Sequence, residues 1–234
     1  MFKNIMLKIS GESLAGDNEQ GFDFSILNDL SNNIKKLVKK KICISIVLGG
    51  GNFIRGSSFS NGVVDRVTSD YMGMLGTVMN SLALQSNLEK VGVPSRVMTA
   101  ININRVAEPY IKNKATRHLE KNRVVIFASG TGNPFFSTDT AAVLRASEMK
   151  SDIIFKGTKV DGIYEEDPIK NTSAKKISEI TYNDYLNRDL KVMDSTAISL
   201  AKDRNIPIII FSIMKSSNIL DIVEGKGDYS IIRS

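Results

Sequence analysis

The regular alternation of strand and helix patterns is the feature of this chain that most constrains its fold. Short apolar runs typical of buried strands alternate with longer segments in which apolar residues recur at helical spacing. This order predicts the α/β class: a three-layer αβα sandwich with a mostly parallel central sheet. The expected strands are residues 5–9, 42–48, 93–99, 123–128, 152–155, 208–211 and, at an edge, 229–233. The expected helices are residues 25–40, 65–90, 104–120, 138–149 and 194–205.

No internal repeat or low-complexity linker divides the 234 residues, so we expect a single domain, with residues 164–176 as a polar loop. The longest apolar run, residues 42–48, is too short to span a bilayer, and residues 1–10 lack the cleavage site of a signal peptide. We therefore expect a cytoplasmic protein with no membrane partner. The net charge of +6 suits small anionic ligands and does not require nucleic acid.

Four glycine-containing loops follow expected strands. They are SGES, GGGNFIRG, SGTGNPFF and KGTKVDGIY, after the strands that begin at residues 5, 42, 123 and 152. Because the carboxyl ends of parallel strands meet at one edge of a sheet, we expect these loops to converge there. Glycines 49–51 let a ligand approach the main chain closely, and several loops with free N–H groups can share a chain of phosphates. This pattern predicts an anion site; the alternative is a tight turn that binds nothing.

The single cysteine, the single histidine and the absence of two common phosphate-binding motifs limit the kinds of site that this sequence can form. Cys43 is the only cysteine, which excludes an internal disulfide and a cysteine metal cluster. His118 is the only histidine, and its polar surroundings, KNKATRHLEKN, weigh against a metal site and a histidine-based triad. We expect Cys43 to fill the core and His118 to be a solvated helix residue. Neither the GxxxxGK[ST] phosphate loop nor the complete dinucleotide fingerprint occurs. A typical P-loop kinase and a typical dehydrogenase are therefore both disfavoured.

Charged residues beside the loops suit phosphoryl transfer. Lys8 ends the first expected strand, and Arg55 follows the glycine run with a planar donor fork. Lys8 alone could be a solvated lysine. Asp139 and Asp194 precede helical patterns, where a capping role is ordinary and an active-site role is the sharper hypothesis. Phosphoryl transfer needs cations, N–H groups and Mg²⁺, but no base when the acceptor is already an anion, as a nucleoside monophosphate is.

Six motifs occur in order across about residues 6–211: LKISGE, VLGGGNFIRG, DYMGMLGTVMN, SGTGNPFFSTDTAA, KGTKVDGIYEEDP and LKVMD. With them the chain resembles the bacterial uridylate kinases of the amino acid kinase superfamily. DYMGMLGTVMN and GTGNPFFSTD resemble uridylate kinases rather than acetylglutamate, carbamate or aspartate kinases. The resemblance implies transfer of a phosphoryl group from ATP to UMP, giving ADP and UDP for pyrimidine nucleotide synthesis. Mg²⁺ would be held through the ATP phosphates and by no residue of the chain.

The resemblance also implies roles for individual residues. Lys8 would be the transition-state cation, Arg55 a phosphate bridge, Asp194 the carboxylate that orients the lysines and Asp139 an organiser at a helix start. The implied ATP residues are Lys8, Ile9, Ser10, Gly11, Gly51, Arg55, Thr158, Tyr164 and Asp167, the last with a plain turn as the alternative. The implied UMP residues are Gly50, Asp70, Thr131, Gly132, Asn133, Pro134, Phe135, Phe136, Ser137 and Thr138.

Residue chemistry refines the UMP set. The Asp70 carboxylate can accept from both ribose hydroxyls, the alternative being a helix-surface aspartate. Thr131, Asn133 and Thr138 could read the uracil edge. Phe135 and Phe136 are expected to pack in the core or between subunits rather than stack on the base. Residues 1–150 would carry the UMP side of the site, and residues 151–234 the ATP side.

The resembled family is commonly a homohexamer, often inhibited by UTP and regulated by GTP, so we expect these properties here. However, basic positions expected on the long helix are Gln85 and Glu89, although Arg96 and Arg123 remain, which weighs against activation by GTP. Two other functions stay open. One is a related kinase acting on a carboxylate or carbamate. The other is a regulatory protein that senses UTP or ATP without turnover, against which Lys8 and Asp194 argue.

Overall fold

The computed structural model describes residues 2–54, 64–166, 168, 170–215 and 218–234. Within this part of the chain, one large sheet has the strand order β4-β3-β5-β2-β1-β6-β10-β11-β9. Neighbouring strands are parallel except β10 and β11, so the predicted mostly parallel α/β sheet is confirmed. The strands are β1 (Asn4–Ile9), β2 (Cys43–Leu48), β3 (Ser95–Thr99), β4 (Glu108–Pro109), β5 (Val124–Ala128), β6 (Ile153–Thr158), β9 (Glu179–Thr181), β10 (Ile208–Ser212) and β11 (Ser230–Arg233).

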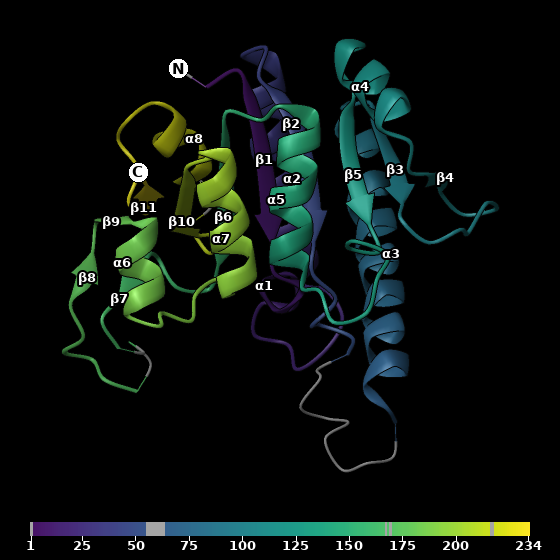
Figure 1. Cartoon of the computed structure of the whole chain (residues 1–234). Helices are drawn as coiled ribbons and strands as arrows, with labels where there is room; N and C mark the ends of the chain where they lie inside the picture. Colours follow the sequence, from purple (N-terminus) through teal and green to yellow (C-terminus); the bar gives the residue numbers. More distant parts are fainter. Residues whose placement is uncertain (1, 55–63, 167, 169, 216–217) are drawn as a thin grey trace.

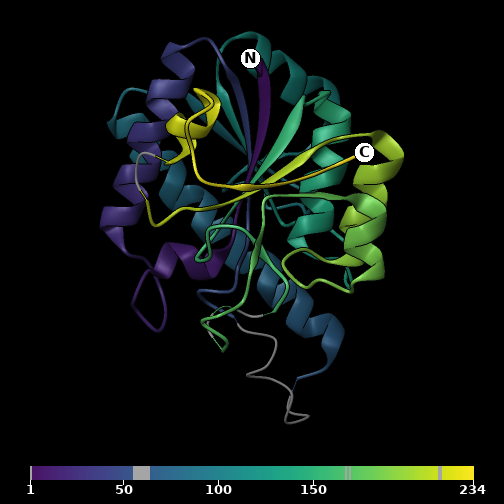
Figure 2. The same ribbon diagram turned by 90° about the vertical axis from the view of Figure 1, so that its left-hand side faces the viewer.

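Helices cover both faces of this sheet, which gives the predicted three layers (Figures 1 and 2). Successive residues of a strand point to opposite faces, so alternate apolar side chains build two cores. Helices α2 and α3 pack on one face, and α5 and α7 on the other. The helices are α1 (Gly11–Ala15), α2 (Phe24–Lys39), α3 (Arg66–Lys90), α4 (Lys112–Glu120), α5 (Thr138–Met149), α6 (Tyr182–Asn187), α7 (Ser195–Arg204) and α8 (Asn218–Val223).

Three expectations about elements are wrong. Residues 229–233 do not form an edge strand, because β11 lies between β10 and the short β9, which now forms the edge. The helix expected over residues 104–120 begins only at Lys112. The residues before it form turns and the two-residue strand β4, where Pro109, without an N–H group, suits the outermost strand. The expected loop over residues 164–176 is closed at its two ends by a small hairpin of β7 (Ile163–Tyr164) and β8 (Lys176–Ile177).

Two single-copy residues also differ from expectation. His118 is not a solvated helix residue: its ring is half-buried, with Nε2 3.2 Å from Glu108 Oε2 and Nδ1 3.2 Å from Arg123 Nη1. Cys43 lies at the margin of the core, half-buried, where burial raises the pKa of its thiol. No helix in the described ranges is long and apolar enough to cross a membrane.

Candidate active site

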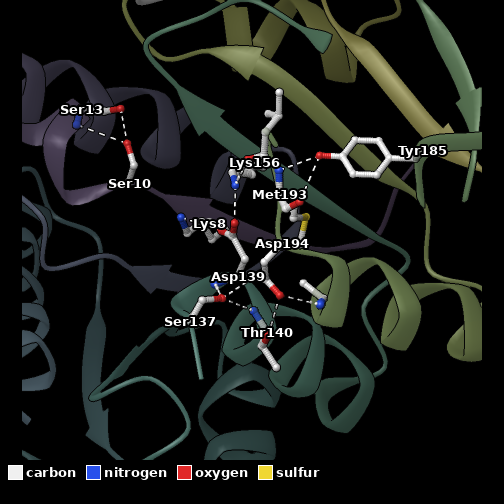
Figure 3. A network of polar contacts seen from close by, with 12 residues as sticks. Lys8, Ser10, Ser13, Ser137, Asp139, Thr140, Lys156, Tyr185, Met193 and Asp194 are labelled. Atoms are coloured by element: carbon white, nitrogen blue, oxygen red, sulfur yellow. Dashed lines mark hydrogen bonds and ion pairs between the residues drawn. The ribbon is translucent and has the colours of Figure 1, made fainter. Parts of the chain in front are cut away.

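Two buried lysines stand side by side near the carboxyl ends of the central strands. Lys8 of β1 and Lys156 of β6 are register partners, so their side chains share one face of the sheet, the face covered by α5 and α7. Asp139, in the first turn of α5, contacts both (Figure 3): its Oδ1 lies 2.7 Å from Lys8 Nζ, and its Oδ2 accepts a hydrogen bond from Lys156 Nζ. All three side chains are at most 12% exposed. A single carboxylate therefore holds two buried cations.

Burial and charge shift the pKa values of this group in ways that matter for chemistry. Burial alone would raise the pKa of Asp139, but the charges of Lys8 and Lys156 outweigh it and hold that pKa well below its usual range. Burial lowers the pKa of Lys156 to about 8, against the opposing influence of the Asp139 charge. Two ammonium groups and one carboxylate leave the trio with a net positive charge in a buried place. An anion that reached the trio would meet little competition from water.

Asp194 takes the capping position that is ordinary for an aspartate before a helix. It is the N-cap of α7, accepting from the Ala197 N–H at 2.9 Å and from Thr140 Oγ1 at 3.2 Å. It also accepts from Ser137 Oγ, and Ser137 is itself the N-cap of α5. Asp194 thus ties the starts of two helices together. The carboxylate that contacts both lysines is Asp139, because its side chain faces the sheet from inside the first helical turn.

Lys156 is a site residue that sequence analysis did not single out, although it opens the motif KGTKVDGIY. The available signal was its place at the end of a buried strand, but its partner could be identified only from the strand register. Beyond Asp139, Lys156 Nζ donates to the main-chain carbonyl of Val192, in the segment that leads to α7. Lys156 is thereby fixed from two elements at once.

The glycine run after β2 is packed tightly between α1 and α3. A Cβ atom on Gly50 would lie 2.5 Å from the Gly73 carbonyl oxygen of α3, and one on Gly11 would lie 2.5 Å from Gly51 N. Next to the run, the buried amides of Asn52 and Asn80 exchange two hydrogen bonds of 2.7 and 2.9 Å. Close backbone packing is therefore one physical reason for the glycines, independent of any ligand.

A cavity of about 160 Å³ opens beside this run, between α3 and the loop that precedes α5. Asp70 borders it; Arg66 Nε lies 3.0 Å from both of its oxygens, and the Phe135 N–H donates to Oδ2 at 2.7 Å. Of the residues predicted for UMP, this cavity brings together Gly50, Asp70, Thr131, Phe136 and Thr138. Its other lining residues are Gly51, Ile54, Ser69, Gly73, Met74, Thr77 and Gly130.

The remaining residues predicted for UMP lie around this cavity without lining it. Thr131 Oγ1 accepts from the Asn133 N–H at 3.2 Å, which shapes the turn that also contains Gly132 and Pro134. Ser137 caps α5. Phe135 and Phe136 are 67% and 52% exposed, so the expectation that they pack in the core of this chain is wrong. Phe135 has a positive φ of 71°, and the Arg66 guanidinium lies over its ring.

A second cavity, of about 440 Å³, lies between the β7–β8 hairpin and the segment after α6. Tyr164 is the one described residue of the predicted ATP set that lines it, and its hydroxyl donates to Asp161 Oδ1 at 2.7 Å. That hydrogen bond raises the pKa of Tyr164 to about 12. The other lining residues are Val160, Gly162, Glu165, Glu166, Pro168, Lys170, Arg188, Asp189, Leu190, Lys191 and Val192.

The other residues predicted for ATP lie at the ends of β1, β2 and β6. The side chain of Ile9 is buried, so only its main chain can face a ligand. Ser10 caps α1, and its Oγ lies 2.5 Å from Ser13 Oγ. Thr158 Oγ1 donates to the Val160 carbonyl at 2.7 Å. Arg55 and Asp167 fall outside the residues that the structure describes.

The lysine pair lies between the two cavities. Thr138 borders the first cavity and is followed by Asp139, while Val192 borders the second and accepts from Lys156. Buried cations between two ligand cavities, at the carboxyl edge of a parallel sheet, suit the transfer of an anionic group from one ligand to another. Fold and site together define a kinase of the α/β class.

Comparison with known proteins identifies the family to which this chain belongs. The profile of the amino acid kinase family matches residues 3–212, and the chain belongs to that family. It is similar to the crystal structure of UMP kinase from Bacillus anthracis, with 39% identity over 99% of this chain and 96% of that one and a TM-score of 0.94. UMP kinase from Ureaplasma parvum is 40% identical over 100% of both chains, also with a TM-score of 0.94. Uridylate kinase from Archaeoglobus fulgidus, at 23% identity and a TM-score of 0.75, shares the fold.

Proposed function

We propose that this protein transfers the γ-phosphoryl group of ATP to UMP, giving ADP and UDP for pyrimidine nucleotide synthesis. The observation that carries the proposal is the Lys8–Asp139–Lys156 trio between two cavities. Full-length similarity to two bacterial UMP kinases supports the choice of acceptor.

In this reaction the chain would act mainly by electrostatic stabilisation of the transferred phosphoryl group. The phosphate of UMP is largely a dianion at neutral pH, so it can attack without a general base. The transferred group carries its charge on peripheral oxygens, and Lys8 and Lys156 are the buried cations suited to stabilise it. Asp139 binds both ammonium groups, and its negative charge offsets their mutual repulsion. Asp194 acts on the geometry by joining the starts of α5 and α7, and we retain Arg55 as a proposed phosphate bridge.

We assign UMP to the smaller cavity and the adenosine part of ATP to the larger one. The first is lined by residues from 50 to 138 and the second by residues from 160 to 192. This supports an acceptor half at about residues 1–150 and an ATP half at about residues 151–234. In the acceptor half, Asp70 is suited to accept from the ribose hydroxyls, and Thr131 and Thr138 to contact the base.

Mg²⁺ belongs to this proposal as part of the substrate MgATP. Among the described residues, no three His, Cys, Asp or Glu side chains gather as a metal site. Asp139 and Asp194 are occupied by lysines and by helix starts. The donor set therefore suits an ion that arrives on the ATP phosphates, where it would neutralise charge as the phosphoryl group moves.

The assembly and its regulation follow from the family resemblance. We propose a homo-oligomer, a hexamer by analogy, that works in the cytoplasm, where its nucleotide substrates are. UTP, as the triphosphate of the same nucleoside, would inhibit by competing for the UMP cavity. For GTP we expect little activation, because Arg96 lies 3.7 Å from Glu108 and Arg123 contacts His118 within this chain.

The decisive experiment measures ADP release from MgATP with UMP, CMP, AMP or no acceptor. We expect release with UMP and strong rejection of CMP, because cytosine would leave buried partners of the uracil N–H and carbonyl unpaired. The Lys8→Ala variant is the matched control: its kcat should fall by about two orders of magnitude or more with the fold intact. ATP binding without UMP-dependent release would contradict the proposal, and activity with a carboxylate or carbamate would reassign the acceptor.

A further inference from the structure

Lys156 depends on a main-chain carbonyl in a segment without regular structure. Residues 188–194 connect α6 to α7 as turns and coil, and the Val192 carbonyl in this segment accepts from Lys156 Nζ. A coil peptide is a weak support for a buried cation unless something holds the peptide itself. The peptide between Val192 and Met193 therefore needs a second contact that fixes its orientation.

The hydroxyl of Tyr185, on α6, holds that peptide from its other side (Figure 3). The Met193 N–H donates to Tyr185 Oη at 2.7 Å, and the same hydroxyl donates to the Met193 carbonyl at 3.1 Å. Tyr185 and Met193 are each 1% exposed, so water does not compete for these hydrogen bonds. One hydroxyl thus satisfies both polar groups of a buried residue.

The geometry of the peptide group makes this contact relevant to Lys156. The Val192 carbonyl and the Met193 N–H belong to one planar peptide, and it is trans, so the two groups point in opposite directions. Lys156 occupies the carbonyl end and Tyr185 the N–H end. Any rotation of the peptide that frees one contact also breaks the other.

We propose that Tyr185 is a positioning residue for phosphoryl transfer, which locks the Val192–Met193 peptide so that its carbonyl holds the Lys156 ammonium in place. Tyr185 touches no reacting atom in this proposal; it acts through the peptide. The inference rests on the proposed function in taking a nucleotide phosphate as the group that Lys156 meets.

The expected consequence is a shift in the pH range over which Lys156 stays charged. The charged and titratable groups around Lys156 are Asp139 from α5, Lys8 from β1, Asp194 at the start of α7 and Tyr185 from α6. A carbonyl that accepts from an ammonium favours the charged form. Loosening that carbonyl lowers the pKa of Lys156 further below its ordinary value, so the charge is lost at lower pH.

The test compares Tyr185→Phe with Tyr182→Phe, a matched control on the same helix. Tyr182 is also buried, and its hydroxyl donates to the Ile206 carbonyl at 2.7 Å, which is not part of the site. Burial raises the pKa of both tyrosines to about 12, so neither hydroxyl ionises in the range tested. Each variant loses one buried hydroxyl and keeps its ring.

The readout is kcat/KM for MgATP, with UMP as acceptor, from about pH 6 to about pH 10. We expect Tyr185→Phe to lower kcat/KM about 2- to 10-fold at neutral pH and to move the alkaline limb of the pH profile to lower pH. Tyr182→Phe should leave the limb where the wild type has it. A loss of stability that is the same at every pH lowers the activity without moving the limb. Unfolding at high pH is controlled by Tyr182→Phe, which loses a comparable buried hydroxyl from the same helix.

Superimposed limbs for the wild type and both variants would overturn the proposal. The affinity for ATP, measured by calorimetry over the same pH range without UMP, separates this inference from the proposed function. If the wild type releases no ADP with UMP, the proposed function fails. The Tyr185 inference then stands or falls on whether the alkaline loss of ATP affinity moves in Tyr185→Phe alone.

Discussion

At the scale of single residues, the central feature is a carboxylate that makes two buried ammonium groups compatible. Lys8 and Lys156 are directly opposite on neighbouring strands, an arrangement that is unfavourable for like charges. Asp139 lowers this repulsion without neutralising both charges, so the site remains attractive to a phosphate. The like charges that attract a phosphate to this site therefore lower the stability of the folded protein.

Replacing Asp139 with Asn tests this balance through stability. We expect Asp139→Asn to lower the free energy of unfolding by about 3–5 kcal/mol at neutral pH, because two buried ammonium groups lose their counterion. The folded-state pKa of Lys156, about 8 in the wild type, should fall further in the variant. Between the lower pKa of the variant and about 8, the variant must release a proton to fold and the wild type need not, so the deficit should shrink as the pH rises toward about 8. Above about 8 both proteins release this proton on folding, so the deficit should stay constant there.

Urea denaturation at several pH values measures this effect. Asp184→Asn is a suitable control, since Asp184 lies in the first turn of α6, where its side chain accepts from Thr181 Oγ1 at 2.8 Å without contacting a lysine of the site. A deficit in Asp139→Asn that stays constant or grows as the pH rises from the acidic range to about 8 would contradict the assigned role.

At the scale of elements, the loop after β2 is held by side-chain amides as well as by its glycines. Asn80 Nδ2 donates to the Gly49 carbonyl at 2.6 Å, and Asn52 Nδ2 donates to the Gly21 carbonyl at 2.8 Å. With their mutual pair, these contacts join the loop, α3 and the segment before α2. Both amides are buried, so each hydrogen bond is costly to lose.

A double-mutant cycle tests this connection. Asn52→Ala and Asn80→Ala should each lower the free energy of unfolding by about 2–3 kcal/mol, because each leaves buried partners unsatisfied. The double variant should lose less than the sum by about 1 kcal/mol or more, since the second change removes a partner that is already unpaired. Denaturant melts of the four proteins give the coupling. Additive losses would show that the two amides act independently.

Sequence patterns predicted an element well where local chemistry marks both of its ends. Helix α5 was predicted with its observed bounds, because Ser137 caps its start and Lys150 ends it in a left-handed conformation. The helix expected from residue 104 was too long, since residues 104–107 form turns and Glu108–Pro109 form the short strand β4. The three-residue β9 escaped notice because its pairing with β11, rather than its own short sequence, makes it a strand.

The candidate site, like the fold, could be predicted from the sequence only in part. Lys8 and the strand-end loops could be located from the positions of the strands. The contact of Asp139 rather than Asp194 with both lysines could not, because both residues begin helices and only the packing of α5 on β1 and β6 decides which one meets the lysines. Lys156 required the register of two strands far apart in sequence.

At the scale of the whole molecule, α3 carries an apolar row that is exposed among the residues that the structure describes. Val67, Tyr71, Leu75 and Met79 follow each other at four-residue intervals, on one side of the helix, and are 38–49% exposed. An exposed apolar row of this kind is typical of a protein–protein contact, here one between copies of the chain. It is the surface we favour for the proposed oligomer.

A charge placed in this row tests that assignment. Leu75→Glu should reduce the molecular mass measured by light scattering after size exclusion, without unfolding the chain, because the side chain is exposed in the monomer. Ile111→Glu, at a residue that is 48% exposed just before α4, is the matched control and should leave the mass unchanged. An unchanged mass for Leu75→Glu would exclude this row as an essential contact.

The position of β1 at the centre of the sheet has a consequence for how the protein is made. It precedes the other described strands in the sequence and so leaves the ribosome before its neighbour β6, which begins only at Ile153. The Lys3 and Asn4 N–H groups bind the Asp152 carboxylate, which is equally late in the chain. Until those residues emerge, a nascent β1 has an open edge, the kind of surface on which chains aggregate. Completion of this sheet is thus a late event in synthesis, and contacts so distant in sequence make folding slow.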